Sequence, residues 1–140
     1  MIKKIAFICV GNSARSQMAE AIAKKMIKER NLDVEVFSAG IEPAGFINAM
    51  AIRVLEEDGI PIENQYSKGL QDIPIDDIDL FVMVCEESNC VFLPGKKTIS
   101  WNLPDPFSYE QFYLIRESLK SKIGELLDNL VLELDKKPKD

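Results

Sequence analysis

The chain contains no histidine, and this absence excludes two common forms of nucleophilic catalysis. A Ser-His-Asp triad and a Cys-His pair both need an imidazole as the general base. A reactive cysteine in this chain must therefore be activated by other means, such as a helix N-terminus or a neighbouring cation.

Cysteine is also scarce, with only Cys9, Cys85 and Cys90 present. An odd number of cysteines in a protein expected to be cytosolic does not favour a static disulfide framework. The chain has no Cys-x-x-Cys pair and no histidine, so its pattern is not that of a zinc site. We expect neither a metal centre nor another bound cofactor.

Long apolar runs are missing as well. No segment approaches the roughly 20 apolar residues that cross a bilayer. The apolar run after Lys3 and Lys4 is short and is followed by no small-residue cleavage site, so we interpret it as a strand rather than a signal peptide. We therefore expect a cytoplasmic protein with no membrane partner.

The charge balance is acidic, with a formal net charge of -6 and a pI of about 4.8. This balance argues against nucleic acid as a partner. At 140 residues the chain is long enough for one domain with its own core. We expect a single domain over residues 1–135 and a disordered tail over residues 136–140.

Apolar patterns of two kinds alternate along the chain. The expected strands are residues 3–9, 34–40, 79–85 and 97–101. The expected helices are residues 16–30, residues 47–58, and a long final segment. Ser108 and Gln111 form a capping-box pattern at the start of that segment. Its apolar stripe is interpreted as core packing and contains Phe112, Ile115, Leu119, Ile123, Leu126, Leu127, Leu130 and Leu134.

The alternation predicts right-handed βαβ units. The expected fold is an α/β three-layer sandwich, with a four-stranded parallel sheet and helices on both faces. Ligands of such sheets bind at the carboxyl ends of the strands. Cys9 and Cys85 both fall at expected strand ends, so we predict that they share one crevice.

The loop after the first strand carries the clearest chemistry, with Cys9 at its entrance and Arg15 at its exit. The first N–H groups of the following helix favour an anion, and Arg15 can offer a planar fork to two of its oxygens. The same groups stabilise a thiolate on Cys9, to which the Ser16 hydroxyl can donate. We predict a Cys9 nucleophile beneath a tetrahedral oxyanion. The predicted oxyanion-binding residues are Val10, Gly11, Asn12, Ser13, Ala14, Arg15 and Ser16.

The run from Cys9 to Glu20 resembles the active-site signature of the low-molecular-weight protein tyrosine phosphatase superfamily. Its Ser-Gln-Met-Ala-Glu portion resembles the arsenate reductase branch, whereas phosphatases of the group usually carry proline where Gln17 stands. Residues 38–43 and 101–106 also match that branch, and the resemblance covers residues 3 to 130.

The resemblance implies Asp105 as a general acid and Cys85 and Cys90 as a redox relay. In this reading, Cys9 forms a thiol-arsenate adduct, Cys85 attacks Cys9 and releases arsenite, and Cys90 then forms a disulfide with Cys85. Thioredoxin or glutaredoxin would reduce that disulfide, and the family default is a monomer. Four residues separate Cys85 from Cys90, a spacing that differs from that of other members of the branch.

Other functions remain open at this point. The same loop would serve a phosphatase that hydrolyses phosphotyrosine or aryl phosphates through a Cys9 phosphocysteine. A binding or redox-sensing module without turnover is a further alternative. A sugar-transport phosphocarrier has a related cysteine loop but no need for Arg15.

Lys68 stands where some members carry an aspartate that helps bind potassium. If Asn12, Glu20 and Ser38 form that cation site, the ammonium of Lys68 is expected to replace the ion.

Overall fold

A parallel sheet of four strands forms the centre of the protein. The computed structural model describes residues 2–86 and 95–136, and the side chains of its last helix up to Leu132. The strands are β1 (Lys4–Cys9), β2 (Glu35–Gly40), β3 (Leu80–Met83) and β4 (Thr98–Ser100). Their order across the sheet is β2-β1-β3-β4, and every neighbouring pair is parallel.

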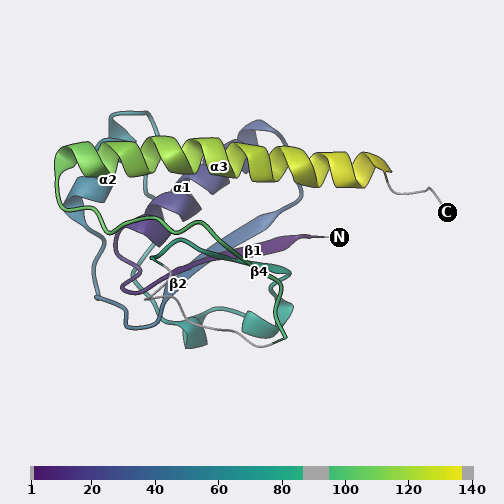
Figure 1. Ribbon diagram of the computed structural model, residues 1–140, viewed down its shortest axis with the longest axis horizontal. Helices are drawn as coiled ribbons and strands as arrows, with labels where there is room; N and C mark the ends of the chain where they lie inside the picture. Colours follow the sequence, from purple (N-terminus) through teal and green to yellow (C-terminus); the bar gives the residue numbers. More distant parts are fainter. Residues whose placement is uncertain (1, 87–94, 137–140) are drawn as a thin grey trace.

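Helices cover both faces of the sheet. The elements are α1 (Arg15–Glu29), α2 (Ala49–Glu56), α3 (Tyr109–Lys136) and the 3-10 helices η1 (Leu70–Asp72) and η2 (Ile75–Asp77). α1 packs on β1 and β2, and α3 packs on α1 and α2. Figure 1 shows α3 along one side of the sheet and the two short helices on the other. The expected three-layer α/β fold is therefore confirmed.

Strands β1 and β3 contribute fully buried side chains to the core. Phe7, Ile8, Phe81 and Val82 are fully buried, as expected for strands that are covered on both faces. On α3 the predicted stripe packs inward from Phe112 to Leu130, with Leu126 only partly buried. The side chain of Leu134 lies outside the described residues.

The start of α3 agrees with the prediction, and its end differs from it. Its start is the predicted capping box, because Gln111 N–H donates to Ser108 Oγ at 3.2 Å and Ser108 N–H donates to Gln111 Oε1 at 3.2 Å. At the other end, Lys136 is still helical, one residue into the expected tail. Residues 137–140 lie outside the described residues. No helix within residues 2–86 and 95–136 combines the length and apolarity that a membrane span requires.

Asp79 ties the start of β1 to the start of β3. Its Oδ2 accepts the backbone N–H groups of Lys3 at 2.8 Å and Lys4 at 2.9 Å. These two donors hold the pKa of the Asp79 carboxyl below its ordinary value of 3.8. Since the pKa is lower in the folded state, the stabilisation is present above that ordinary value and is lost as pH falls through the folded-state pKa.

Asp79→Asn should lower the melting temperature at neutral pH by about 3 °C, a small effect because the side chain is exposed and solvent screens the interaction. The difference from the wild-type protein should shrink as pH falls below the ordinary carboxyl value. Melting curves recorded from neutral to acidic pH check this. The matched control is Asp33→Asn, since Asp33 pairs with the exposed side chain of Lys3 rather than with backbone N–H groups. A deficit that stays constant down to acidic pH would contradict the assignment.

Candidate active site

The loop from Val10 to Ala14 joins β1 to α1 at the carboxyl end of the sheet. Its carbonyl oxygens are bonded on their outer side by the segment that follows β2. Glu42 N–H donates to Val10 O at 2.9 Å, Ala44 N–H to Gly11 O at 2.9 Å and Asn48 N–H to Ser13 O at 2.8 Å. These three carbonyl oxygens are therefore engaged with the segment after β2. A carbonyl oxygen directed at a bound anion would repel it, so this arrangement suits an anion site.

Gly40, the last residue of β2, lies directly against this loop. A Cβ atom built there would lie 2.5 Å from Val10 O and 2.8 Å from Asn12 N. No side chain fits at those distances, so glycine is required for the loop to pack on the sheet.

Asn12 gives the loop its turn and its internal support. It adopts a left-handed backbone conformation, with φ of 47°, and its side chain is fully buried. Asparagine tolerates this conformation better than most residues with a side chain. The side-chain amide lies behind the loop, where it donates to Ser16 Oγ at 2.8 Å and Ser38 Oγ at 3.0 Å.

Cys9 is a free thiol, 2% exposed, beneath the loop. Ser16 Oγ lies 2.8 Å from its Sγ, and Asn12 N–H donates to the same sulfur at 3.3 Å. Since Ser16 Oγ accepts from the Asn12 amide, its own hydrogen is available to the sulfur. Two donors aimed at one sulfur stabilise a thiolate, and no histidine is involved.

α1 begins at Arg15, directly after the loop. Ala14 precedes it and supplies no side-chain cap, so the first N–H groups of α1 keep their capacity for an anion. The Arg15 guanidinium is 7% exposed; Nη1 donates to Leu103 O at 2.8 Å, and Nη2 lies 3.7 Å from Asp105 Oδ1. Asp105 itself is 56% exposed.

A cavity of about 370 Å³ lies above the loop and brings the predicted groups together. Cys9, Arg15 and Asp105 line it. Four further predicted residues line it too: Val10, Gly11, Ser13 and Ala14. Asn12 and Ser16 do not line this cavity, because both are fully buried behind the loop.

Several cavity residues were not predicted from the sequence. They are Asn48, Pro106, Phe107 and Phe112. Phe107 follows the Asp105-Pro106 pair directly, so its position was a usable signal. Asn48 gave none, since it reaches the cavity through the connection after β2.

Cys85 follows β3, the strand next to β1. Val84 N–H donates to Ile8 O at 2.9 Å, so the chain stays paired with β1 up to the residue before Cys85. Cys85 is fully buried. Cys9 ends β1 and Cys85 lies two residues after the end of β3, so both stand at the carboxyl ends of neighbouring strands. Cys85 is not among the described residues that line the cavity, so a crevice shared by the two cysteines stays a prediction. Cys90 lies outside the described residues.

Comparison with known proteins decides the family. The model of the family described as low molecular weight phosphotyrosine protein phosphatase matches residues 4–139. The chain belongs to this family. This phosphatase-family chain is 38% identical over 134 residues to "Arsenate reductase 1" of Staphylococcus haemolyticus, a match that covers 92% of the chain and 98% of that relative.

Two solved structures are also similar. One, described as an arsenate reductase in the phosphate binding state, is 33% identical with a TM-score of 0.79, and the match covers 91% of this chain and 98% of that one. The other is a thioredoxin-dependent arsenate reductase of Corynebacterium glutamicum, 30% identical with a TM-score of 0.76. That match covers 94% of this chain and 63% of the longer protein.

Proposed function

We propose that this enzyme of the low-molecular-weight phosphatase family reduces arsenate to arsenite. The observation that carries the proposal is the cavity in which a buried Cys9 thiol, the Arg15 guanidinium and the Asp105 carboxyl meet. It is supported by relatives named arsenate reductase that match nearly their whole length, at 37% to 39% identity.

The first step uses the loop and the cavity. The Cys9 thiolate attacks the arsenic atom of arsenate and forms an S–As bond, while one arsenic–oxygen bond breaks. The Arg15 guanidinium and the N–H groups at the start of α1 balance the charge on the remaining oxygens. Asp105 donates a proton to the departing oxygen, which leaves as water.

The second step is the redox step. A Cys85 thiolate attacks Cys9 Sγ, the S–As bond breaks, and its electron pair stays on arsenic, which becomes arsenite. Arsenic gains two electrons, and the two thiols lose them as they form a Cys9–Cys85 disulfide. The burial of both cysteines at neighbouring strand ends supports this pairing.

The third step restores Cys9. A Cys90 thiolate attacks Cys85, the Cys9–Cys85 bond breaks, and a Cys85–Cys90 disulfide remains. An external dithiol of the thioredoxin or glutaredoxin type then reduces it. The similarity to a thioredoxin-dependent enzyme supports the first of these. We further propose a monomeric, cytoplasmic enzyme.

The test is arsenate turnover by the purified protein with thioredoxin or glutaredoxin as the reductant. Disulfides trapped by rapid acid quenching and alkylation are mapped by mass spectrometry. The proposal expects arsenite together with both the Cys9–Cys85 and the Cys85–Cys90 bonds. Arsenate binding without arsenite release by either reductant would refute it.

Hydrolysis of aryl phosphates is the second candidate function, and Phe107 favours it. This aromatic side chain lines the cavity beside Asp105 yet is 84% exposed. Such a ring at the mouth of an oxyanion site can stack on the aryl group of a phosphoester. The loop chemistry is shared, with a Cys9 phosphocysteine that water hydrolyses.

Asp105→Asn should lower kcat for aryl phosphate hydrolysis by about 100-fold, since general acid catalysis typically contributes that much or more. The loss should be larger for phenyl phosphate than for p-nitrophenyl phosphate, because the second leaving group needs less help from an acid. Asp128→Asn, at an exposed carboxylate on α3 that pairs with Arg30, is the matched control. An equal loss for both esters would contradict the role of Asp105 as an acid.

A further inference from the structure

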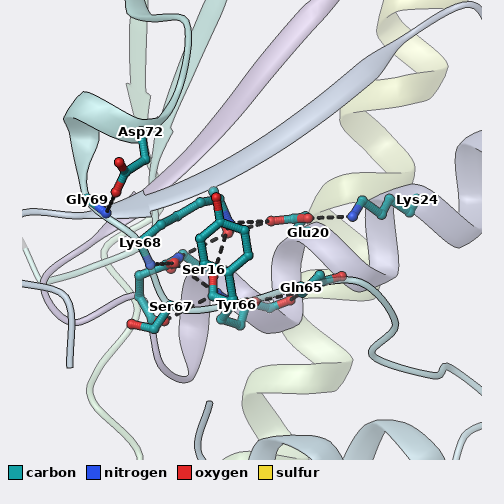
Figure 2. Close-up of polar contacts among 12 residues, drawn as sticks. Ser16, Glu20, Lys24, Gln65, Tyr66, Ser67, Lys68, Gly69 and Asp72 are labelled. Atoms are coloured by element: carbon teal, nitrogen blue, oxygen red, sulfur yellow. Dashed lines mark hydrogen bonds and ion pairs between the residues drawn. The ribbon is translucent and has the colours of Figure 1, made fainter. Parts of the chain in front are cut away.

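The segment from Gln65 to Lys68 contacts the Cys9 loop and the start of α1, and Figure 2 shows it beside Ser16 and Glu20. Gln65 Nε2 donates to Gln17 Oε1 at 2.7 Å, and Tyr66 O accepts from Gln17 Nε2 at 2.9 Å. Ser67 Oγ donates to Gly11 O at 3.2 Å. We call this segment, residues 65–68, the brace.

Lys68 makes the contact of the brace with the centre of the loop. Its backbone N–H donates to Asn12 Oδ1 at 2.9 Å, and Gln17 Nε2 donates to the same oxygen at 2.8 Å. Two donors on Oδ1 fix the orientation of the Asn12 amide. Its Nδ2 must then face Ser16 and Ser38 as a donor, which leaves the Ser16 hydroxyl hydrogen for Cys9.

The side chain of Lys68 acts on the other end of this network. The Ser38 hydroxyl donates to Glu20 Oε1 at 2.5 Å, and Lys68 Nζ lies 3.6 Å from the same carboxylate oxygen. The side chain of Glu20 is 5% exposed and that of Lys68 is 10% exposed. Lys24 Nζ lies 2.5 Å from Glu20 Oε2, but its side chain is 43% exposed (Figure 2).

Burying a carboxylate is costly unless opposite charge and hydrogen-bond donors surround it, and Glu20 has both. A carboxylate oxygen accepts hydrogen bonds, so the Ser38 hydroxyl donates to Glu20. Ser38 Oγ can then accept from Asn12, so the hydrogen bonds run outward from Asn12 Nδ2, through Ser38 to Glu20 on one side and through Ser16 to Cys9 on the other. The path therefore runs from the Lys68 ammonium through Glu20, Ser38, Asn12 and Ser16 to the Cys9 sulfur.

This neighbourhood does not fit the potassium ion that the resemblance implies. A metal cation needs oxygen lone pairs directed at it. Each Glu20 oxygen already faces an ammonium, and Asn12 presents its N–H groups to Ser38 rather than its oxygen. Within the described residues, no group of three or more cysteine, aspartate or glutamate side chains could hold a metal ion.

We propose that Lys68 is a positioning residue for the Cys9 thiolate and takes the place of a bound cation. Its ammonium pairs with the buried Glu20 carboxylate, and its backbone N–H sets the Asn12 amide, so that the Ser16 hydroxyl donates to Cys9. The proposal rests on Cys9 as the nucleophile, but it holds for phosphoester hydrolysis as well as for arsenate reduction.

The test is Lys68→Met, which removes the ammonium and keeps the backbone N–H. We expect the rate of Cys9 alkylation by iodoacetamide at neutral pH, and kcat for aryl phosphate, to fall about fivefold, which corresponds to about 1 kcal/mol. The concentration of phosphate that protects Cys9 from alkylation should change less than twofold, since the cavity groups are untouched. Lys68→Arg should restore both rates. Lys25→Met, at a lysine that contacts Gly59 O instead, is the control.

Unchanged rates in Lys68→Met would overturn the proposal, because Lys24 alone would then suffice for Glu20. A full fivefold loss in Lys68→Met that persists in the Glu20→Gln background would also overturn it, since the loss would then come from the Lys68 contact with Tyr66 O at 3.2 Å and not from Glu20. Potassium added to the wild-type protein at constant ionic strength should leave activity and melting temperature unchanged. A higher melting temperature of the wild-type protein with potassium would contradict the proposal that Lys68 replaces a bound cation. This test needs no variant. None of these readouts uses arsenate, so failure of arsenate reduction is a separate result.

Discussion

In the Cys85→Ser variant, arsenite release should fall to the background rate, while hydrolysis of aryl phosphate should stay within about twofold of the wild-type rate. Serine cannot attack a sulfur to form a disulfide, so the thiol-arsenate adduct on Cys9 has no internal route to reduction. Phosphoester hydrolysis needs the Cys9 loop, Arg15 and Asp105 only, and these remain.

The measurement is arsenic speciation during turnover with thioredoxin, next to a p-nitrophenyl phosphate assay on the same preparation. Because Cys85 is fully buried, its replacement by serine places a hydroxyl in the core. Cys85→Ala is therefore the matched second variant, and both should behave alike. Cys90→Ser is the control for order, since it should permit one turnover and then stop as a Cys9–Cys85 disulfide.

Normal arsenate reduction by Cys85→Ser would show that the relay is wrong and that an external thiol attacks the adduct directly. Loss of both activities together would instead show that the substitution disturbs the loop. The proposed division of roles survives only if the two reactions separate.

In the Arg15→Lys variant, both reactions should lose about 1000-fold in kcat/KM. Removal of one preorganised donor to a developing oxyanion typically costs 100-fold to 1000-fold, and here the guanidinium also supports the loop through Leu103 O. Lysine keeps the charge but cannot present two parallel N–H groups to two oxygens.

Steady-state kinetics with arsenate and with p-nitrophenyl phosphate check this expectation. Arg53→Lys is the matched control, because Arg53 is an exposed arginine whose partner is Glu57 on the same side of α2. The melting temperature reports any structural cost of the lost Leu103 contact. If Arg15→Lys keeps activity within tenfold, then the charge alone is sufficient and bidentate binding is not used.

The local pattern of the sequence predicted the fold well. Apolar runs at 3–9 and 79–85 became β1 and β3, and the capping pair Ser108 and Gln111 placed the start of α3 within one residue. These features are decided by neighbours in the chain. The expected strand at 79–85 extended two residues too far, because the assigned β3 ends at Met83, although Val84 still bonds to Ile8 O.

From the residues alone, the candidate site was predictable where one short motif supplies it, whereas Asp105 was predicted from the family resemblance. Cys9, Arg15 and the residues between them are contiguous, so their spacing predicts a shared anion site. The support behind the loop comes from far along the chain, from Gly40 and from the brace 56 residues away at Lys68. Such contacts depend on how β2 and the segment after α2 pack on the loop, and no local periodicity of the sequence predicts them.

The loop around Cys9 is held by residues 42–48, by Gly40 and by the brace. A loop with this many supports gives little scope for shape discrimination between two tetrahedral anions of the same charge. Phosphate and arsenate are such a pair, so phosphate should compete at the mouth of the cavity. Selectivity then depends on whether the central atom of the bound anion accepts electrons. Arsenic(V) takes two electrons from a thiol pair readily and phosphorus(V) does not, so the enzyme distinguishes its substrates after binding rather than by it.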